Sequence, residues 1–116
     1  MTTRSQDQVR VLVPEHELYG GPECDEMERE LMAHARAGHS VVVDLSQVRK
    51  LNARCLGILA TAHLLASVRG GHVAICGVRP AGLWLLRRTG LAGVLTVEED
   101  AAAATRDPAL RPRAVA

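Results

Sequence analysis

Apolar and polar residues follow one another along this chain in blocks that predict strands and helices in alternation. Short runs rich in valine, leucine and isoleucine are typical of strands. They lie at residues 9–13, 41–45, 73–78 and 94–97. Residues 16–19 add a short extended segment after Pro14, so the chain is expected to open with a hairpin or a bent strand. Every residue of the run at 41–45 except Asp44 is apolar, which indicates a strand buried on both faces of a sheet.

Between the strands, apolar residues recur at helical spacing. Met27, Leu31 and Ala35 lie four residues apart on one face of a predicted helix over 23–37, which Gly38 ends. Three further helices are predicted over 52–68, from Pro80 to a glycine C-cap at Gly90, and over 98–105, where acids occupy the first turn.

This alternation, in a chain of 116 residues of which 47% are hydrophobic, predicts one small α/β domain with a single core. The domain is expected to span residues 8–105, with flexible tails at 1–7 and 106–116. The core must be aliphatic, because the chain has no Phe, one Tyr and one Trp. Trp84 carries a large apolar surface, so at least partial burial of its ring is expected.

Charge and cysteine content argue against several classes of function. A formal net charge of +1 gives no strong field to hold nucleic acid or an anionic membrane. Three cysteines without paired short spacings indicate free thiols in a reducing compartment, not a secreted disulfide framework. No apolar run approaches the length of a membrane span, and the N-terminus has no hydrophobic signal core. We therefore expect a cytoplasmic protein that neither binds nucleic acid nor inserts into a membrane.

Several short segments, in order along the chain, carry a resemblance to a known family. His16-Glu17-Leu18-Tyr19 sits where that family has Gly-Glu-Leu-Asp, and residues 41–48 match its Val-Val-Leu-Asp-Leu-Ser-x-Val strand. Further matches are Gly70-Gly71 before a strand, Pro80-Ala81 at a helix start and Thr89-Gly90-Leu91 near a helix end. The chain thus resembles a STAS domain, the fold of bacterial anti-sigma factor antagonists. The resemblance implies a small mixed β-sheet of about four to five strands packed with about four α-helices, and a regulatory protein, not an enzyme.

The departure from the family lies in the turn that opens the second helix. The family's turn reads Asp-Ser-Ser-Gly-Leu-Gly, and a partner kinase phosphorylates its second Ser. The matching positions here are Asn52, Ala53, Arg54, Cys55, Leu56 and Gly57. Arg54 stands at the phosphoacceptor position, where it cannot accept a phosphoryl group and adds a positive charge that the helix dipole disfavours. The family's two acids are also replaced, by Asn52 in the turn and by Tyr19 upstream.

This joint loss has two interpretations. In the first, the switch has fallen idle in a domain that still packs and is able to form a homodimer. In the second, the switch is locked, or its surface is rebuilt for a partner that offers a carboxylate or phosphate to Arg54. The second interpretation predicts a partner-binding surface made of Tyr19, Leu51, Asn52, Ala53, Arg54, Cys55, Leu56 and Gly57.

The resemblance implies a kinase-type anti-sigma factor, or another regulatory protein, as the partner. Two other classes of function remain open. The chain is alternatively a regulatory or structural subunit of a transporter or a sensory complex. It is also compatible with a nucleotide-binding STAS module, in which Arg54 at a helix N-terminus would anchor the phosphates.

Other chemistry has weaker support in the sequence. No metal or cofactor is expected, because the histidines and cysteines lack ligand spacing and no glycine-rich phosphate loop is present. Ser46, His63 and Asp44 do not form a hydrolase triad, since Ser46 lacks a nucleophile-elbow sequence. Cys55, at a helix N-terminus beside Arg54, is either a thiol of lowered pKa or a small half-buried residue in place of the family's glycine.

Overall fold

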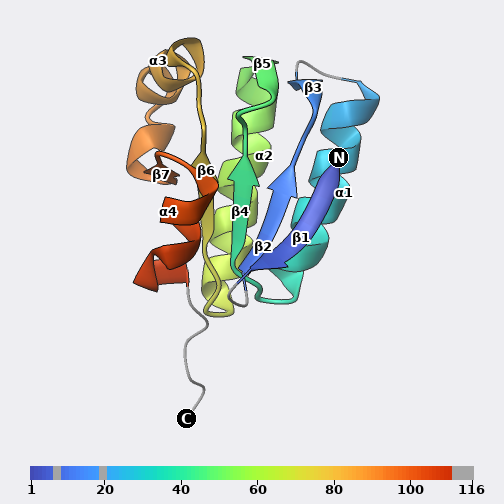
Figure 1. The fold of residues 1–116 in the computed structure, drawn as a ribbon, viewed down its shortest axis with the longest axis vertical. Helices are drawn as coiled ribbons and strands as arrows, with labels where there is room; N and C mark the ends of the chain where they lie inside the picture. The colour runs from blue at the N-terminus through green and yellow to red at the C-terminus, as the bar shows by residue number, and fades with distance from the viewer. Residues whose placement is uncertain (7–8, 19–20, 111–116) are drawn as a thin grey trace.

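The computed structural model describes residues 1–6, 9–18 and 21–110. Within these ranges, five strands form the main sheet in the order β1-β2-β4-β6-β7, and all but β1 run parallel (Figure 1). The strands of the main sheet are β1 (Thr2–Gln6), β2 (Val9–Val13), β4 (Val41–Asp44), β6 (Val73–Cys76) and β7 (Thr96–Glu98). Two shorter strands, β3 (His16–Leu18) and β5 (Val48–Leu51), pair in parallel beyond the main sheet.

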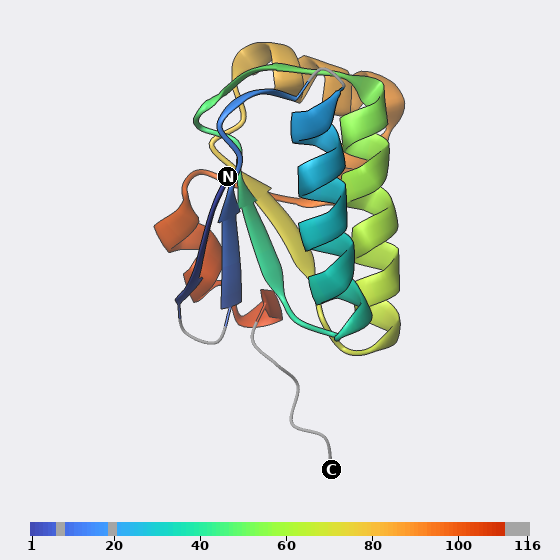
Figure 2. The ribbon, with the colours of Figure 1, turned by 90° about the vertical axis from the view of Figure 1, so that its right-hand side faces the viewer.

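Helices cover both faces of the main sheet and its end. They are α1 (Pro22–Arg36), α2 (Ala53–Val68), α3 (Pro80–Thr89) and α4 (Ala101–Arg106), with 3-10 turns at η1 (Leu91–Gly93) and η2 (Pro108–Leu110). Figure 2 shows α1 and α2 side by side on one face and α4 on the other, while α3 lies beyond the end of the strands. No helix in the described part of the chain is both long enough and apolar enough to span a bilayer.

The alternation of side chains along the central strands divides the core in two. Val41 and Val43 of β4 face α1 and α2, where they join the larger cluster with Leu31 and Leu59. Val42 faces the other way and packs in the smaller cluster under α4. The predicted strand buried on both faces is therefore confirmed, although it covers Val41–Asp44 and not 41–45, and Asp44 is half-buried. The glycine C-cap is confirmed by the left-handed backbone of Gly90.

The N-terminal part differs from the prediction. Residues 1–7 were expected to be a flexible tail, but Thr2–Gln6 pairs antiparallel with β2 as an edge strand. The opening hairpin is therefore β1–β2, and β3 pairs with β5 instead. The sequence signal was missing because an exposed edge strand needs only backbone hydrogen bonds, so its side chains can all be polar.

The C-terminal elements also shift. The last strand covers Thr96–Glu98 and not 94–97, and the last helix begins at Ala101, with Asp100 as its N-cap. The acids expected in the first turn of that helix therefore precede it. Leu110 is fully buried against the smaller cluster, so packing extends past residue 105, where the domain was expected to end.

Candidate functional site

The predicted turn lies beyond the carboxyl ends of the parallel strands, together with the starts of three helices. The chain leaves β4 at this end of the sheet and reaches α2 through β5, and it leaves β6 there to reach α3 (Figure 1). The N-terminus of α1 lies at the same end, because α1 runs beside α2 in the same direction (Figure 2). In open α/β sheets, ligands generally bind outside the carboxyl ends of the strands.

Asn52 fixes the start of α2. Its backbone is extended, with φ −113° and ψ 172°, and its side-chain oxygen accepts a hydrogen bond from the Cys55 N–H at 3.0 Å. Its own N–H donates to the Leu18 carbonyl at 3.3 Å, which ties the turn to the end of β3. Asn and Asp are comparable as N-caps, so Asn52 keeps the cap without a carboxylate.

Arg54 is exposed in the first turn of α2, and it forms an ion pair with a residue of the neighbouring helix α1. Its Nη2 donates to Asp25 Oδ1 of α1 at 3.1 Å, and the two side chains are 50% and 54% exposed. The hydrogen bond to Asp25 raises the pKa of Arg54, so the guanidinium keeps its charge. Asp25 lies in the first turn of its own helix, where the dipole favours an acid, and it offsets the unfavourable position of Arg54.

Cys55 is buried and faces Cys24 of α1. Its Sγ donates to the Leu18 carbonyl at 2.9 Å and lies 2.7 Å from Cys24 Sγ. Burial raises the pKa of Cys55 to about 12, with a further contribution from the hydrogen bond to Cys24. The interpretation of Cys55 as a thiol of lowered pKa is therefore wrong, because burial outweighs the helix N-terminus and the nearby Arg54.

The other residues of the predicted surface divide into an outer and an inner set. Ala53 and Gly57 are exposed, and a Cβ built on Gly57 would meet no atom within 4 Å. Leu51 is half-buried, and Leu56 is fully buried in the larger core. The side chain of Leu56 therefore supports the turn from beneath. Tyr19 lies outside the described residues.

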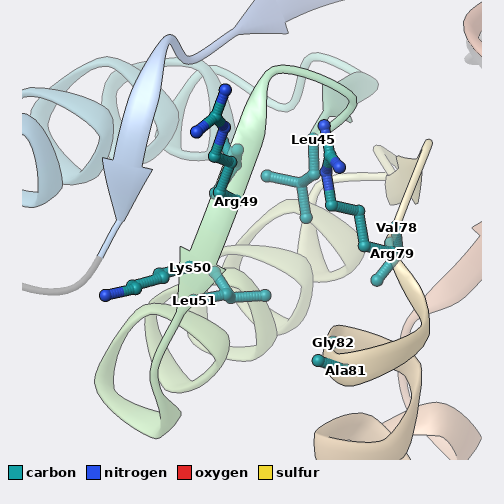
Figure 3. A pocket seen from close by; sticks show the side chains of 9 residues that line it. Leu45, Arg49, Lys50, Leu51, Val78, Arg79, Ala81 and Gly82 are labelled. Carbon is teal, nitrogen blue, oxygen red and sulfur yellow. The ribbon is translucent and has the colours of Figure 1, made fainter.

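A small pocket borders the turn on the side of α3. It has a volume of about 160 Å³ and lies between β5 and the start of α3, where Leu45, Leu51 and Val78 supply apolar walls. Figure 3 shows Leu45 and Leu51 pointing into this space and Lys50 pointing away from it. Pockets that enclose drug-sized ligands usually measure roughly 300–1,000 Å³. This pocket does not enclose a nucleotide by itself, and Arg54, the proposed phosphate anchor, is not among its lining residues.

The remaining polar candidates have structural roles. Asp44 Oδ1 accepts the Ser46 N–H at 3.0 Å within one turn, whereas His63 Nδ1 accepts the Val73 N–H at 3.2 Å, so the three residues do not act as a triad. No group of three or more metal-ligating side chains occurs among the residues that the structure describes. Trp84, which was expected to be at least partly buried, is 61% exposed, with the Arg88 guanidinium over its ring.

The outer face of α2 carries a feature that the sequence reasoning missed. Leu64 and Val68 are 60% and 85% exposed, and they follow the turn along the same helix. The sequence did contain a signal for this apolar face, because no charged residue occurs between Cys55 and Val68. Residues four positions apart lie next to each other on a helix, so Leu64 and Val68 form a small apolar patch on the outer face.

Comparison with known proteins identifies the fold. Residues 20–97 match the family described as "Mlab, STAS domain". A candidate anti-sigma factor antagonist of Thermotoga maritima is 16% identical, with a TM-score of 0.79 over 91% of this chain and 92% of that one. An anti-sigma-factor antagonist (STAS) domain protein of Planctomyces limnophilus is 17% identical, with a TM-score of 0.75 over 90% and 93% of the two chains.

The phosphorylated form of the Bacillus cell fate determinant SpoIIAA is also similar, with a TM-score of 0.65 and 10% identity over 90% of this chain and 96% of that one. At these identities the likeness demonstrates a shared fold. The predicted mixed α/β architecture is thereby confirmed. No curated protein sequence matches the chain significantly.

Proposed function

Because the chain belongs to the STAS domain family, we propose that it is a regulatory protein-binding module whose docking surface is not switched by phosphorylation. The proposed partner is an anti-sigma factor of the kinase type. The docking surface consists of the exposed residues Ala53, Arg54 and Gly57 at the start of α2 and Asp25 at the start of α1. Asn52, Cys55 and Leu56 hold this surface from beneath, Leu51 flanks it, and Tyr19 is the further contact expected from the sequence.

The proposal rests on the position of Arg54 in the turn and on its positive charge. It stands where the family has its phosphoacceptor serine, and residues 51–60 contain no hydroxyl group. The nearest hydroxyl in α2, that of Thr61, donates to the Gly57 carbonyl of its own helix at 2.9 Å. A fixed positive charge therefore occupies the position at which phosphorylation would introduce a negative one.

The ion pair with Asp25 leaves Arg54 able to bind a partner. A guanidinium has five N–H donors in a planar fork, and the hydrogen bond to Asp25 uses one of its two terminal nitrogens. Half of the side chain remains exposed, so its other donors can reach a carboxylate on a partner, and a two-point contact of this kind is among the strongest polar contacts. We propose binding and not catalysis, because the other polar groups of the turn cap the helix or are buried.

The test is a binding titration against purified kinase-type anti-sigma factors from the source organism. The parent chain is compared with Arg54→Glu and with Arg69→Glu, which reverses an exposed charge at the other end of α2. We expect Arg54→Glu to weaken binding at least tenfold and Arg69→Glu to have little effect. Equal affinity of the parent and Arg54→Glu for a factor that binds would contradict the proposal.

The same mixtures test the absence of switching. With labelled ATP, we expect no phosphate on residues 51–60, because no acceptor is present there. Phosphate transfer to Thr61 that releases the partner would overturn this part of the proposal. Restoring Asp, Ser and Ser at Asn52, Ala53 and Arg54 is the positive control for an active kinase.

A second candidate function is a constant subunit of a transporter or sensory complex. The exposed Leu64 and Val68 favour it, since interfaces between permanent partners are more apolar than transient ones. For such a subunit, Val68→Asp would abolish co-purification with the complex, whereas Arg54→Glu would leave it intact. The opposite pattern supports the anti-sigma factor assignment.

A further inference from the structure

Two cysteines from different helices meet directly beneath the docking surface. Cys24 lies in the first turn of α1 and Cys55 in the first turn of α2, and their Sγ atoms are 2.7 Å apart. Both residues are fully buried, and they are separated by 31 positions in the sequence. A disulfide has an S–S distance of about 2.05 Å, so the two sulfurs need to approach by less than about 1 Å.

The hydrogen bonds around the pair assign its protons. Cys55 has one thiol hydrogen, and its Sγ donates that hydrogen to the Leu18 carbonyl at 2.9 Å. The hydrogen between the two sulfurs must then come from Cys24. The Cys24 thiol therefore donates to Cys55, and the two sulfurs are in contact with no side chain between them.

The third cysteine provides an internal comparison. Cys76 is also fully buried, but it lies in the smaller core on the other face of the sheet. Burial raises the pKa of Cys76 to about 12, the same direction and size as for Cys55. Burial and acidity are therefore matched between Cys55 and Cys76, and contact with a second thiol distinguishes them.

We propose that Cys24 and Cys55 are a redox modification site that a hydroperoxide converts reversibly into an intramolecular disulfide. Local opening at the helix starts exposes one of the two buried thiols, which loses its proton. The thiolate attacks an oxygen of hydrogen peroxide, the O–O bond breaks, and the leaving hydroxide takes up the proton, so a sulfenic acid and water form. The second sulfur attacks the sulfenic sulfur, the S–O bond breaks and a second water leaves. Two thiols and one peroxide give one disulfide and two waters, and a dithiol reductant reverses the change.

Oxidation would alter the docking surface from beneath. The disulfide has no S–H, so the Leu18 carbonyl loses the Cys55 donor and keeps the Asn52 N–H, and the first turns of α1 and α2 become covalently joined. Asp25 directly follows Cys24, and Arg54 directly precedes Cys55. The bond therefore holds Asp25 against Arg54, and we expect it to weaken partner binding several-fold. This consequence rests on the proposed function, whereas formation of the disulfide does not.

The test uses the full chain, reduced, freed of reductant and exposed to graded hydrogen peroxide. The protein is then denatured, its free thiols are alkylated, and intact masses and peptides are analysed. We expect the loss of two hydrogen atoms, a peptide linkage between Cys24 and Cys55, and alkylation of Cys76 alone. Dithiothreitol should restore alkylation of all three cysteines, and Tm should rise by several degrees on oxidation and fall back on reduction.

Matched variants show which sulfurs react. Cys76→Ser should retain the mass loss, and Cys24→Ala and Cys55→Ala should each abolish it. Alkylation of all three cysteines after peroxide treatment, or a linkage that includes Cys76 or joins two chains, would overturn the proposal. If an alanine variant does not fold, the peptide map of the parent chain still shows whether Cys24 and Cys55 are linked. Oxidised protein that carries the linkage yet binds its partner as tightly as before would reject only the coupling to the docking surface.

Discussion

The two ends of the parallel sheet use their polar side chains in different ways. At the end where the strands start, histidines pair with each other and with the backbone: His34 Nδ1 lies 3.2 Å from His39 Nδ1, and the rings of His63 and His72 pack edge to face at 4.5 Å. At the end where the strands finish, polar groups surround the start of α2, and Arg54 stays half exposed above them. The histidines at the first end contact other parts of the fold, whereas Arg54 at the second end is accessible to a partner.

Burial explains why the histidine end is structural. Desolvation lowers the pKa of His63, and it is also the main cause of the lowered pKa of His34. Both rings are therefore neutral near pH 7, and His63 accepts the Val73 N–H that begins β6. At the end where the strands finish, the charged side chain of Arg54 is half exposed, so a partner could form a charged contact with it there.

The largest expected contrast between the two ends comes from glycine. A Cβ on Gly71 would lie 2.7 Å from the carbonyl oxygens of Gly38 and His39, so Gly71→Ala should destabilise the fold by about 1–3 kcal/mol. Gly57→Ala meets open space inside a helix and should stabilise it by about 0.5–1 kcal/mol. Urea unfolding measures both changes. A loss of stability in Gly57→Ala would show that the start of α2 is packed as tightly as the histidine end.

The N-cap at Asn52 is the next largest expected effect. Asn52→Ala removes the acceptor of the Cys55 N–H and should lower the free energy of unfolding by about 1 kcal/mol. Asn52→Asp keeps the cap and adds a charge that the dipole favours, so it should be at least as stable as the parent. Equal destabilisation by both substitutions would mean that the side-chain cap does not hold the turn.

Acid should weaken the histidine end selectively. The folded pKa of His63 lies below its ordinary value of 6.5, so the unfolded chain binds more protons between the two values. The stability that His63 contributes is complete above pH 6.5 and is lost as the pH falls through the folded pKa. His63→Asn keeps an acceptor that does not titrate, so its Tm should fall less than the parent's between pH 7 and 5. Parallel Tm curves for the two proteins would contradict this assignment.

The smallest expected effect on stability is at the exposed ion pair. Asp25→Asn removes the partner of Arg54, but exposed pairs contribute little, so Tm should change by no more than about 2 °C. If Arg54 serves the partner, this variant should bind at least as tightly as the parent, because the guanidinium is released. A large fall in Tm would assign Arg54 a structural role instead.

The sequence predicted those elements whose pattern is local. The apolar run at 41–45 and the spacing of Met27, Leu31 and Ala35 gave β4 and α1 to within about a residue at each end. β5 went unpredicted, because Arg49 and Lys50 in its middle are exposed and break the apolar run. Its pairing with β3 depends on how distant segments pack, which no short window contains.

The candidate site was predictable to the same extent. The cap at Asn52 and the exposure of Arg54 follow from their places at a helix start. Asp25 and Cys24 lie 29 and 31 positions from their partners, and they meet them only because α1 packs beside α2 in the same direction. The raised pKa of Cys55 has the same origin, since burial between two helices reverses the effect expected from the helix start alone.

The most direct test of the account is a charge swap between Asp25 and Arg54. Arg54→Glu places two acids together, whereas the double variant Asp25→Arg, Arg54→Glu restores an ion pair with its charges reversed. Affinity for the anti-sigma factor is measured for both variants and the parent, alongside Tm. We predict that the double variant recovers the parent's Tm and still binds at least tenfold more weakly, because the partner contacts a cation at position 54. Recovery of the parent's affinity in the double variant would contradict the central claim.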